Sequence, residues 1–192
     1  TNTKDFIRGY GYQGGASRED PSELVAELKY GPKLVEAILK PGEWSVNLLA
    51  FGETLPDHKN RMYMDESKKD EWGLPTITFD AAFGENEFKM RKDMQEQAKK
   101  MLETAGYKNV RGYDNGGKAM GLGIHEMGTA RMGRDPKTSV LNEYNQVHAC
   151  TNVYVTDGAF MTSSGCQNPS LTYMAFTARA ANHAAKELKK NA

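Results

Sequence analysis

The run GLGIHEMGTARMG at residues 121–133 places a single histidine, His125, among glycines and methionines. Glycine is conformationally costly to order, so a run this rich in it indicates an unusual backbone path or a close approach to another group. An imidazole can accept a proton from a hydroxyl group at neutral pH. The run therefore predicts either a base set against a bound ligand or a histidine that is only hydrogen-bonded within a tight turn.

A second set of polar residues surrounds the expected final helix. The strand before it ends in Asp157 and Gly158. A loop of small residues then leads to Asn168 and Pro169, which are favoured as the cap and the first residue of a helix. Free amides in a first helical turn, here that of Ser170, attract anionic groups. This segment is interpreted either as an anion-binding helix start or as a well-capped helix without a ligand.

Composition argues against several classes of function. The 192 residues carry no formal net charge, so no electrostatic signal favours nucleic acid or an anionic membrane surface. The sequence contains no apolar stretch of about 18 residues that would predict a membrane span. A metal hydrolase is a further hypothesis, but its four candidate ligands lack a tight pair such as CxxC or HExxH, so no metal site is predicted. These candidates are His125, Glu126, His148 and Cys150.

The run GYGYQG at residues 9–14 fits the GxGxxG pattern of dinucleotide-binding loops. That pattern binds a pyrophosphate where it joins a buried strand to the start of a helix. The preceding KDFIR is short and charged, and the following GASREDP is typical of a loop. A turn or a glycine-bearing strand is therefore the favoured interpretation, and no cofactor is assigned to these glycines.

Hydrophobic periodicity and turn residues predict the elements that must position these groups. A helix is expected over residues 20–42, with a break at Gly31 and Pro32, and a long amphipathic helix over 85–106. A closing helix is expected over residues 169–188. Strands are expected at 43–53, 61–66, 75–83, 109–113 and 152–158.

These elements predict an α+β fold in two parts. Residues 1–120 are expected to form an antiparallel sheet with flanking helices, and residues 121–192 to supply the C-terminal strand and helix of an incomplete α/β domain. A lone strand and a lone helix cannot bury their apolar faces well against each other, so the second part is expected to belong to a larger sheet. Trp44 and Trp72 are expected to pack in a core, with stacking on a sugar ring as the alternative.

Three motifs between residues 125 and 183 together resemble the carboxy-terminal signature of the glucose–methanol–choline (GMC) flavoprotein oxidoreductases. They are HEMGTARMG, SVLNEYNQVH and NVYVTDGAFMTSSGCQNPSLTYMAFTARAANH, in this order. The middle segments FGETLPDHKNRMYMD and KKDEWGLP are similar, less distinctively, to the substrate-domain region of bacterial GMC sugar dehydrogenases. Residues 1–40 resemble the family weakly.

The resemblance implies an enzyme that uses FAD to oxidise a CH–OH group of a sugar or related alcohol by hydride transfer. It implies that His125, in the family's HxxGT motif, takes the hydroxyl proton beside the flavin. Asn168 would hydrogen-bond the same oxygen beside the cofactor, and the amide of Ser170 would face the flavin pyrimidine edge. Asp157 and Gly158 would lie along the ribityl–pyrophosphate part of FAD.

Members of the family begin with a Rossmann-like segment that binds the ADP part of FAD, and nothing in this sequence resembles it. The resemblance therefore assigns residues 1–120 to part of a substrate-binding domain and 121–192 to the final return into the FAD-binding domain. This segment alone is expected to bind flavin poorly and to be inactive, with the activity belonging to a longer parent protein.

The motifs lean toward dehydrogenases similar to glucoside 3-dehydrogenase or gluconate 2-dehydrogenase. Within this interpretation the electron acceptor can be a protein such as a cytochrome, a quinone, or oxygen in an oxidase. The alternative hypothesis is a non-catalytic carbohydrate-binding or interaction module derived from the same family.

Overall fold

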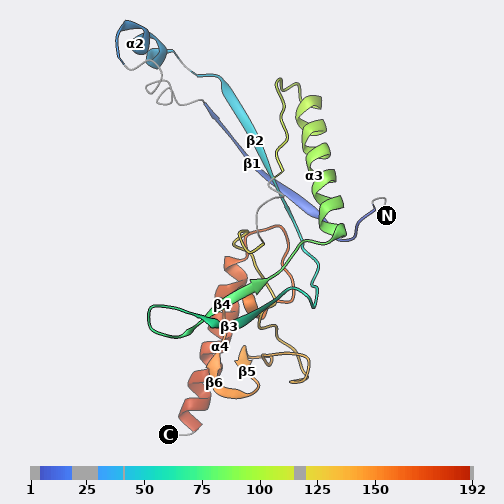
Figure 1. Ribbon diagram of the computed structural model, residues 1–192, viewed down its shortest axis with the longest axis vertical. Helices are drawn as coiled ribbons and strands as arrows, with labels where there is room; N and C mark the ends of the chain where they lie inside the picture. The colour runs from blue at the N-terminus through green and yellow to red at the C-terminus, as the bar shows by residue number, and fades with distance from the viewer. Residues whose placement is uncertain (1–4, 19–29, 41, 115–119, 191–192) are drawn as a thin grey trace.

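The computed structural model describes residues 5–18, 30–40, 42–114 and 120–190, and within them it confirms an α+β fold (Figure 1). Three two-stranded antiparallel sheets pair β1 with β2, β3 with β4 and β5 with β6 in this part of the chain. The elements in chain order are β1 (Tyr10–Arg18), α2 (Pro32–Leu39), β2 (Trp44–Gly52), β3 (Arg61–Lys69), β4 (Pro75–Asp80), α3 (Glu85–Thr104), β5 (Gln146–Val147), β6 (Cys150–Tyr154), the 3-10 helix η1 (Gly158–Phe160) and α4 (Ser170–Lys190).

β1 and β2 form a long ribbon in an unbroken register that pairs Tyr10 with Gly52 and Arg18 with Trp44. Gly11 and Gly14 of GYGYQG lie in β1, and Gly9 directly precedes it, which confirms the interpretation of this run as a glycine-bearing strand. Gly14 lies so close to the backbone carbonyl of Asn47, across the ribbon, that a Cβ atom would collide with it. Gly11 and Gly14 therefore allow close packing on the strand.

The helix α2 lies at the far end of the ribbon from α3 (Figure 1). It begins at Pro32, directly after the break that the sequence predicted, and Gly31 before it has a φ of 117° that favours glycine. The earlier portion of the predicted helix over 20–42 falls largely on residues 19–29, outside the described residues. Trp44, at the same end of the ribbon, is 63% exposed, and Trp72 is 77% exposed, so their predicted core placement is wrong.

β3 and β4 confirm the two strands predicted in this region, although β3 runs longer and β4 shorter than expected. Their register pairs Met62 with Phe79 and Met64 with Ile77. Because directly opposed residues share one face of a ribbon, these side chains form one apolar face. All four are exposed, with Phe79 at 75%.

α3 packs on one face of the ribbon at the end nearest the N-terminus of the described chain (Figure 1). The Tyr10 hydroxyl donates to Asp93 at 2.5 Å, and the Tyr12 hydroxyl donates to the carbonyl of Met94 at 2.6 Å. Burial, together with the bond to Asp93, raises the pKa of Tyr10 above its ordinary value, so the phenol stays a hydrogen-bond donor. The buried cluster that joins helix to ribbon comprises Phe6, Met90 and Met94, with Tyr10 and Ala50 packed against it.

Residues 109–113 form no strand in the described chain, so that prediction is wrong. Asn109 has a φ of 57°, which turns the backbone out of the extended conformation. The C-terminal strand and helix are confirmed as β6 and α4. A small second core holds them, where Phe160 of η1 is 2% exposed and stacks on Phe176 of α4 at a ring distance of 4.7 Å.

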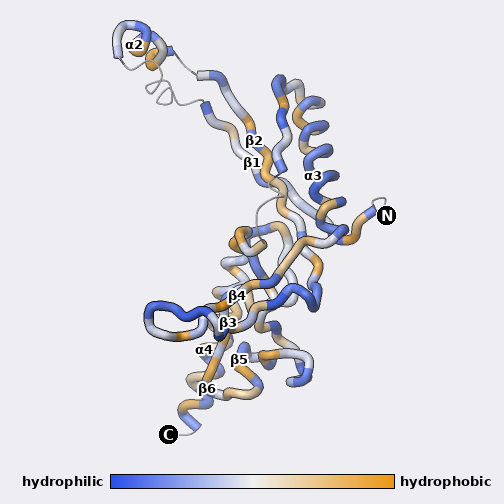
Figure 2. Tube along the Cα trace, in the orientation of Figure 1, coloured by the Kyte–Doolittle hydropathy of each residue, from blue (hydrophilic) through white to orange (hydrophobic). Residues whose placement is uncertain are grey.

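The molecule is extended, and its accessible surface is 15072 Å². A compact monomer of 21.3 kDa exposes about 9,000 Å² by the usual size scaling. Figure 2 shows hydrophobic positions spread along the whole length rather than gathered at one centre. Much apolar surface on α4 and on the β3–β4 ribbon is therefore open, as expected for parts that pack against further structure.

None of the helices in the described residues is both long enough and apolar enough to span a bilayer.

Glu87→Gln in the full-length protein is expected to lower the free energy of unfolding at pH 7 by about 1–3 kcal/mol. Glu87 is 6% exposed, and its carboxylate accepts from the amides of Leu55 at 2.9 Å and Gly84 at 2.8 Å. Burial alone would raise the pKa of Glu87, but these hydrogen bonds outweigh it and hold the pKa below the ordinary 4.5. Chemical unfolding over a range of pH measures the effect.

The sign of the pH dependence follows from that lowered pKa. The advantage of wild type over the variant should be complete above about pH 4.5, the ordinary value for the unfolded chain, and should shrink as the pH falls through the lowered pKa of the folded state. Glu85→Gln is the matched control, because the side chain of Glu85 is 82% exposed and its pair with Lys89 lies at the surface. A pH-independent difference would contradict the assignment.

Candidate active site

His125 lies in a tight loop that the backbone enters and leaves in left-handed conformations. Gly121 and Gly128 have φ values of 85° and 86°, and Ile124, directly before the histidine, has a φ of 67°. A positive φ is unfavourable for a β-branched residue such as isoleucine, so this turn is held by its surroundings. The amide of Gly123 donates to the Glu126 carboxylate at 2.8 Å and closes the loop, which leaves His125 half-buried.

The segment after His125 packs along η1. The amide of Ala130 donates to the carbonyl of Ala159 at 3.0 Å, and the amide of Met132 donates to the carbonyl of Phe160 at 3.0 Å. Gly158 is buried at the tightest point. A Cβ atom there would lie 2.7 Å from the Tyr173 hydroxyl and 2.9 Å from the backbone oxygen of Glu126. The histidine loop, residues 121–128, is thus fixed to the turn that follows β6.

The side chain of Asp157 has a local partner. It accepts a hydrogen bond from the amide of Ala159 at 2.9 Å and so caps η1. Asp157 is exposed, and Gly158 is buried against the histidine loop. Asp157 therefore begins η1, whereas the neighbours of Gly158 belong to α4 and the histidine loop.

The helix α4 begins one residue later than the sequence predicted. Its first helical bond runs from the amide of Tyr173 to the carbonyl of Pro169 at 3.1 Å, so Pro169 is the flanking residue and Ser170 the first helical one. Within the described residues, the side chain of Asn168 makes no hydrogen bond to the helix, which corrects its predicted role as the cap. Pro169 is buried, while Asn168 and Ser170 on either side are exposed.

This helix start keeps amides available for a ligand. The amides of Ser170, Leu171 and Thr172 precede the first helical bond and so have no acceptor within the helix. Leu171 is 79% exposed, so the first turn is open. The partial positive charge of the end of α4 therefore faces an accessible region beside Asn168.

Three residues of the β1–β2 ribbon contact either the histidine loop or the loop before α4. None of the three was predicted as a site residue. The ring of Phe51 lies 6.4 Å from that of His125. Gln13 donates from Nε2 to the carbonyl of Cys166 at 3.1 Å, and a Cβ atom on Gly11 would lie 2.5 Å from the Cys166 sulfur. The glycines of β1 could be seen in the sequence, but their contact with Cys166 could not be predicted, because Cys166 lies far along the chain. The ribbon is therefore part of the site.

Tyr173 is a further residue that sequence reasoning missed. Its hydroxyl lies 3.7 Å from the sulfur of Met127, in the histidine loop, and it packs against Gly158. Burial, with the nearby negative charges of Asp157 and Glu126, raises the pKa of Tyr173. The phenol is therefore a neutral spacer between α4 and the loop that carries His125.

The remaining histidines and cysteines have other surroundings. Nε2 of His148 lies 3.1 Å from the Ser139 hydroxyl and 3.2 Å from the carbonyl of Gly133. The thiol of Cys150 donates to Asn152 at 3.0 Å. Within the described ranges, no group of three His, Cys, Asp or Glu residues could hold a metal ion. The four residues proposed as ligands of a metal hydrolase therefore have separate local partners and do not form one cluster.

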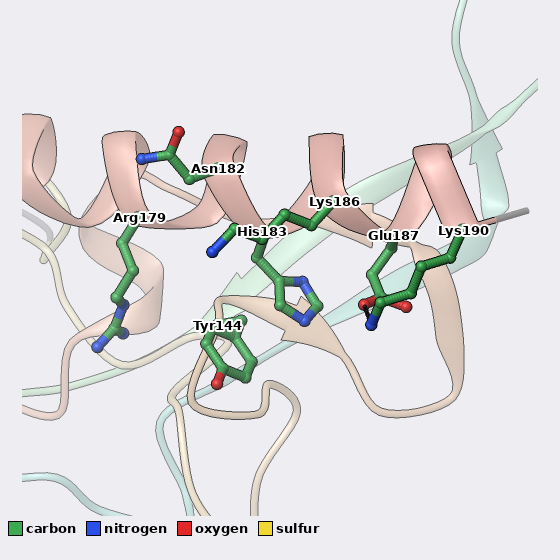
Figure 3. A pocket seen from close by; sticks show the side chains of 7 residues that line it. All are labelled: Tyr144, Arg179, Asn182, His183, Lys186, Glu187 and Lys190. Atoms are coloured by element: carbon green, nitrogen blue, oxygen red, sulfur yellow. Dashed lines mark hydrogen bonds and ion pairs between the residues drawn. The ribbon is translucent and has the colours of Figure 1, made fainter.

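His183 lines a groove beside the second half of α4 (Figure 3). Its ring stacks on Tyr144 at a centroid distance of 4.0 Å, and Nδ1 lies 3.0 Å from the Tyr154 hydroxyl. His183 is about 20 Å along the helix from Ser170 at the helical rise per residue. The residues that line this groove include neither His125 nor the first turn of α4.

With this geometry in place, the comparison with known proteins identifies the family. The sequence model of the GMC oxidoreductase family matches residues 56–177, which include the histidine loop, η1 and the start of α4. The chain belongs to the GMC oxidoreductase family. The match includes the histidine loop and the loop before α4. The β1–β2 ribbon precedes the matched residues in the sequence.

Curated relatives agree with this assignment. The chain is 35% identical to paromamine 6'-oxidase of Streptomyces fradiae over 69% of its own length and 24% of that protein. It is 31% identical to the fructose dehydrogenase large subunit of Gluconobacter japonicus over 95% of its own length and 32% of that protein. It is 24% identical to the gluconate 2-dehydrogenase flavoprotein of Pantoea cypripedii over 99% of its own length and 34% of that protein. The chain thus spans only 24–34% of the length of these relatives.

Gly158→Ala in the full-length protein is expected to lower the free energy of unfolding by about 1–3 kcal/mol, the usual effect of overpacking. The new methyl group would collide with the Tyr173 hydroxyl and the Glu126 carbonyl and would push both away from residue 158. Thermal unfolding measures the effect. Gly9→Ala is the matched control, because no atom lies within 4 Å of its Cβ position. Equal melting of the two variants would contradict the close packing of the histidine loop on η1.

Proposed function

We propose that the full-length protein is an FAD-dependent oxidoreductase that oxidises a CH–OH group of a sugar or sugar derivative, with His125 as the base. The observation that carries this proposal is that the histidine loop and the loop before α4 both contact the β1–β2 ribbon. The histidine loop contacts Phe51, and the loop that leads to Asn168 contacts Gln13. Both segments lie in the part of the chain that the family model matches.

The chemistry of the donor set fits a flavin. The first turn of α4 offers amides without helical acceptors, and the exposed side chains of Asn168 and Ser170 flank it. Such an end suits the negative charge that a reduced flavin carries along its pyrimidine edge. Bound FAD would supply the acceptor for the hydride that leaves the alcohol carbon. Asn168, Ser170, Asp157 and Gly158 are the residues proposed to hold it.

The roles of the two polar side chains follow from the balance of the reaction. Oxidation of an alcohol to a carbonyl removes a hydride from carbon and a proton from oxygen. His125 is proposed to take that proton, since imidazole is the side chain most often used as a general base. Asn168 is proposed to donate a hydrogen bond to the same oxygen, because an amide holds the oxygen without competing for its proton.

The class of substrate and the acceptor are proposed from the relatives. Two of those named above bear the names of sugars or sugar acids, fructose and gluconate, and a third is named for paromamine. The name of the fructose enzyme as a large subunit supports a partner protein, such as a cytochrome, as electron acceptor. Anaerobic addition of sugars to the purified full-length protein tests this class directly. Bleaching of a flavin absorption band would support it, whereas a protein that stays colourless with added FAD would favour the non-catalytic carbohydrate-binding module.

His125→Ala in the full-length protein is expected to lower the rate constant of flavin reduction by about 10²–10⁴-fold, the range for loss of a general base. Flavin content should stay near that of wild type, because the histidine loop closes through Gly123 and Glu126 rather than through the imidazole. Stopped-flow absorbance under anaerobic conditions measures the rate. His58→Ala, at an exposed histidine, is the matched control. Unchanged reduction in the His125 variant would remove it from the mechanism.

Asn168→Ala is expected to slow flavin reduction by roughly 10- to 100-fold, which corresponds to a lost hydrogen bond of about 1–3 kcal/mol. The free energy of unfolding should change by less than about 0.5 kcal/mol, since Pro169 rather than Asn168 flanks the helix. The same kinetic assay and thermal unfolding measure the two quantities. Gln167→Ala, at the exposed neighbour, serves as the control. A large loss of stability with normal reduction would restore a capping role to Asn168.

A further inference from the structure

The two candidate catalytic loops meet the β1–β2 ribbon at a single rung. Gly11 of β1 and Phe51 of β2 are directly opposed in the register. Opposed residues of an antiparallel pair project to the same face of a ribbon, a few ångströms apart. The Cβ position of Gly11 faces Cys166, and the ring of Phe51 faces His125. One rung therefore supports both loops on the same face.

A second contact on that face fixes the loop before α4. Gln13 follows Gly11 by two positions, so its side chain projects to the same face of β1. Its Nε2 donates to the carbonyl of Cys166 at 3.1 Å. The sulfur of Cys166 lies 2.5 Å from the place where a Cβ atom on Gly11 would be. The loop thus lies directly against the backbone of the strand, and Asn168 follows two residues later.

The opposite face of the same strand is anchored to α3. Tyr10 and Tyr12 alternate with Gly11 and Gln13, and their hydroxyls bond to Asp93 and to the carbonyl of Met94. The Cβ position of Gly52, opposite Tyr10, is occupied by Met90 and Met94. The strand pair cannot yield toward α3 without breaking these contacts, so a group added on the loop face must displace the loop.

We propose that the Gly11–Phe51 rung is a positioning element that sets the place of His125 relative to Asn168. Phe51 orients the imidazole by ring contact. The absence of a side chain at Gly11 lets the loop before α4, which carries Cys166 (the Cys166 loop), approach the ribbon, so that Asn168 faces the same substrate oxygen as His125. The inference rests on the proposed function. Gly11 and Phe51 are positioning residues, since they act through the two polar side chains.

The test is a suppressor experiment in the full-length protein. Gly11→Ala should push the Cys166 loop outward and slow the limiting rate of flavin reduction by a sugar at least tenfold, while flavin content and the sugar concentration for half-maximal rate stay within twofold of wild type. Cys166→Ala removes the sulfur that collides with the new methyl group and leaves a contact of 3.2 Å with Cβ, which a shift of a few tenths of an ångström relieves. The double variant Gly11→Ala, Cys166→Ala should therefore regain most of the rate.

Gly15→Ala on the same strand is the matched control, because the nearest atom to its Cβ position is 3.7 Å away. A Gly11→Ala variant as fast as wild type would overturn the inference, and so would a slow variant that Cys166→Ala fails to rescue. If Gly11→Ala does not fold, Phe51→Leu decides. It keeps an apolar side chain but loses the ring, and an unchanged limiting rate would overturn the proposal. A wild-type protein whose flavin no sugar reduces would instead contradict the proposed function.

Discussion

The alternation of side chains in β1 is the constraint on which the candidate site depends. Tyr10 and Tyr12 hold one face of the strand to α3 through their hydroxyls. Gly11 and Gln13 turn the other face to the loop that precedes α4. Since strand geometry sends successive side chains to opposite faces, one short stretch joins α3 to the loop before α4. Its sequence of aromatic and small residues has a direct structural reason.

The histidine loop is held by a second, independent contact. Its backbone runs along η1, and the bare backbone of Gly158 lets it approach α4 closely. Backbone contacts of this kind fix a loop without using the imidazole. The loop that carries His125 is therefore held by η1 through the main chain, and the imidazole lies beside the ring of Phe51. Support from two elements limits the orientations that such a side chain can take.

The C-terminal strand and helix and the local run around His125 could be predicted because their signals lie within a few residues. The absence of a strand at 109–113 could not, because a strand needs a partner to pair with, and no strand of the described chain pairs with this segment, whose first residue, Asn109, has a left-handed φ of 57°. The contacts of Gly11 and Phe51 could not be predicted either, since their partners, Cys166 and His125, lie far away in the sequence. The start of α4 moved by one residue because the carbonyl of Pro169 accepts the first helical bond. The exposed tryptophans show that aromatic content alone does not locate a core in so extended a chain.

The distance along the chain between the joined segments affects how the protein is made. Gln13 and its acceptor on Cys166 are separated by 153 positions. Closing so long a stretch of chain costs conformational entropy, and contacts between residues far apart in the sequence slow folding relative to local ones. During synthesis the ribbon can pair with α3 well before the segment around Cys166 has emerged, since domains assemble from the amino terminus onward. The loop before α4 can therefore reach the ribbon only after the chain has been made as far as Cys166, and the face of β1 that carries Gly11 and Gln13 stays uncovered by that loop until then.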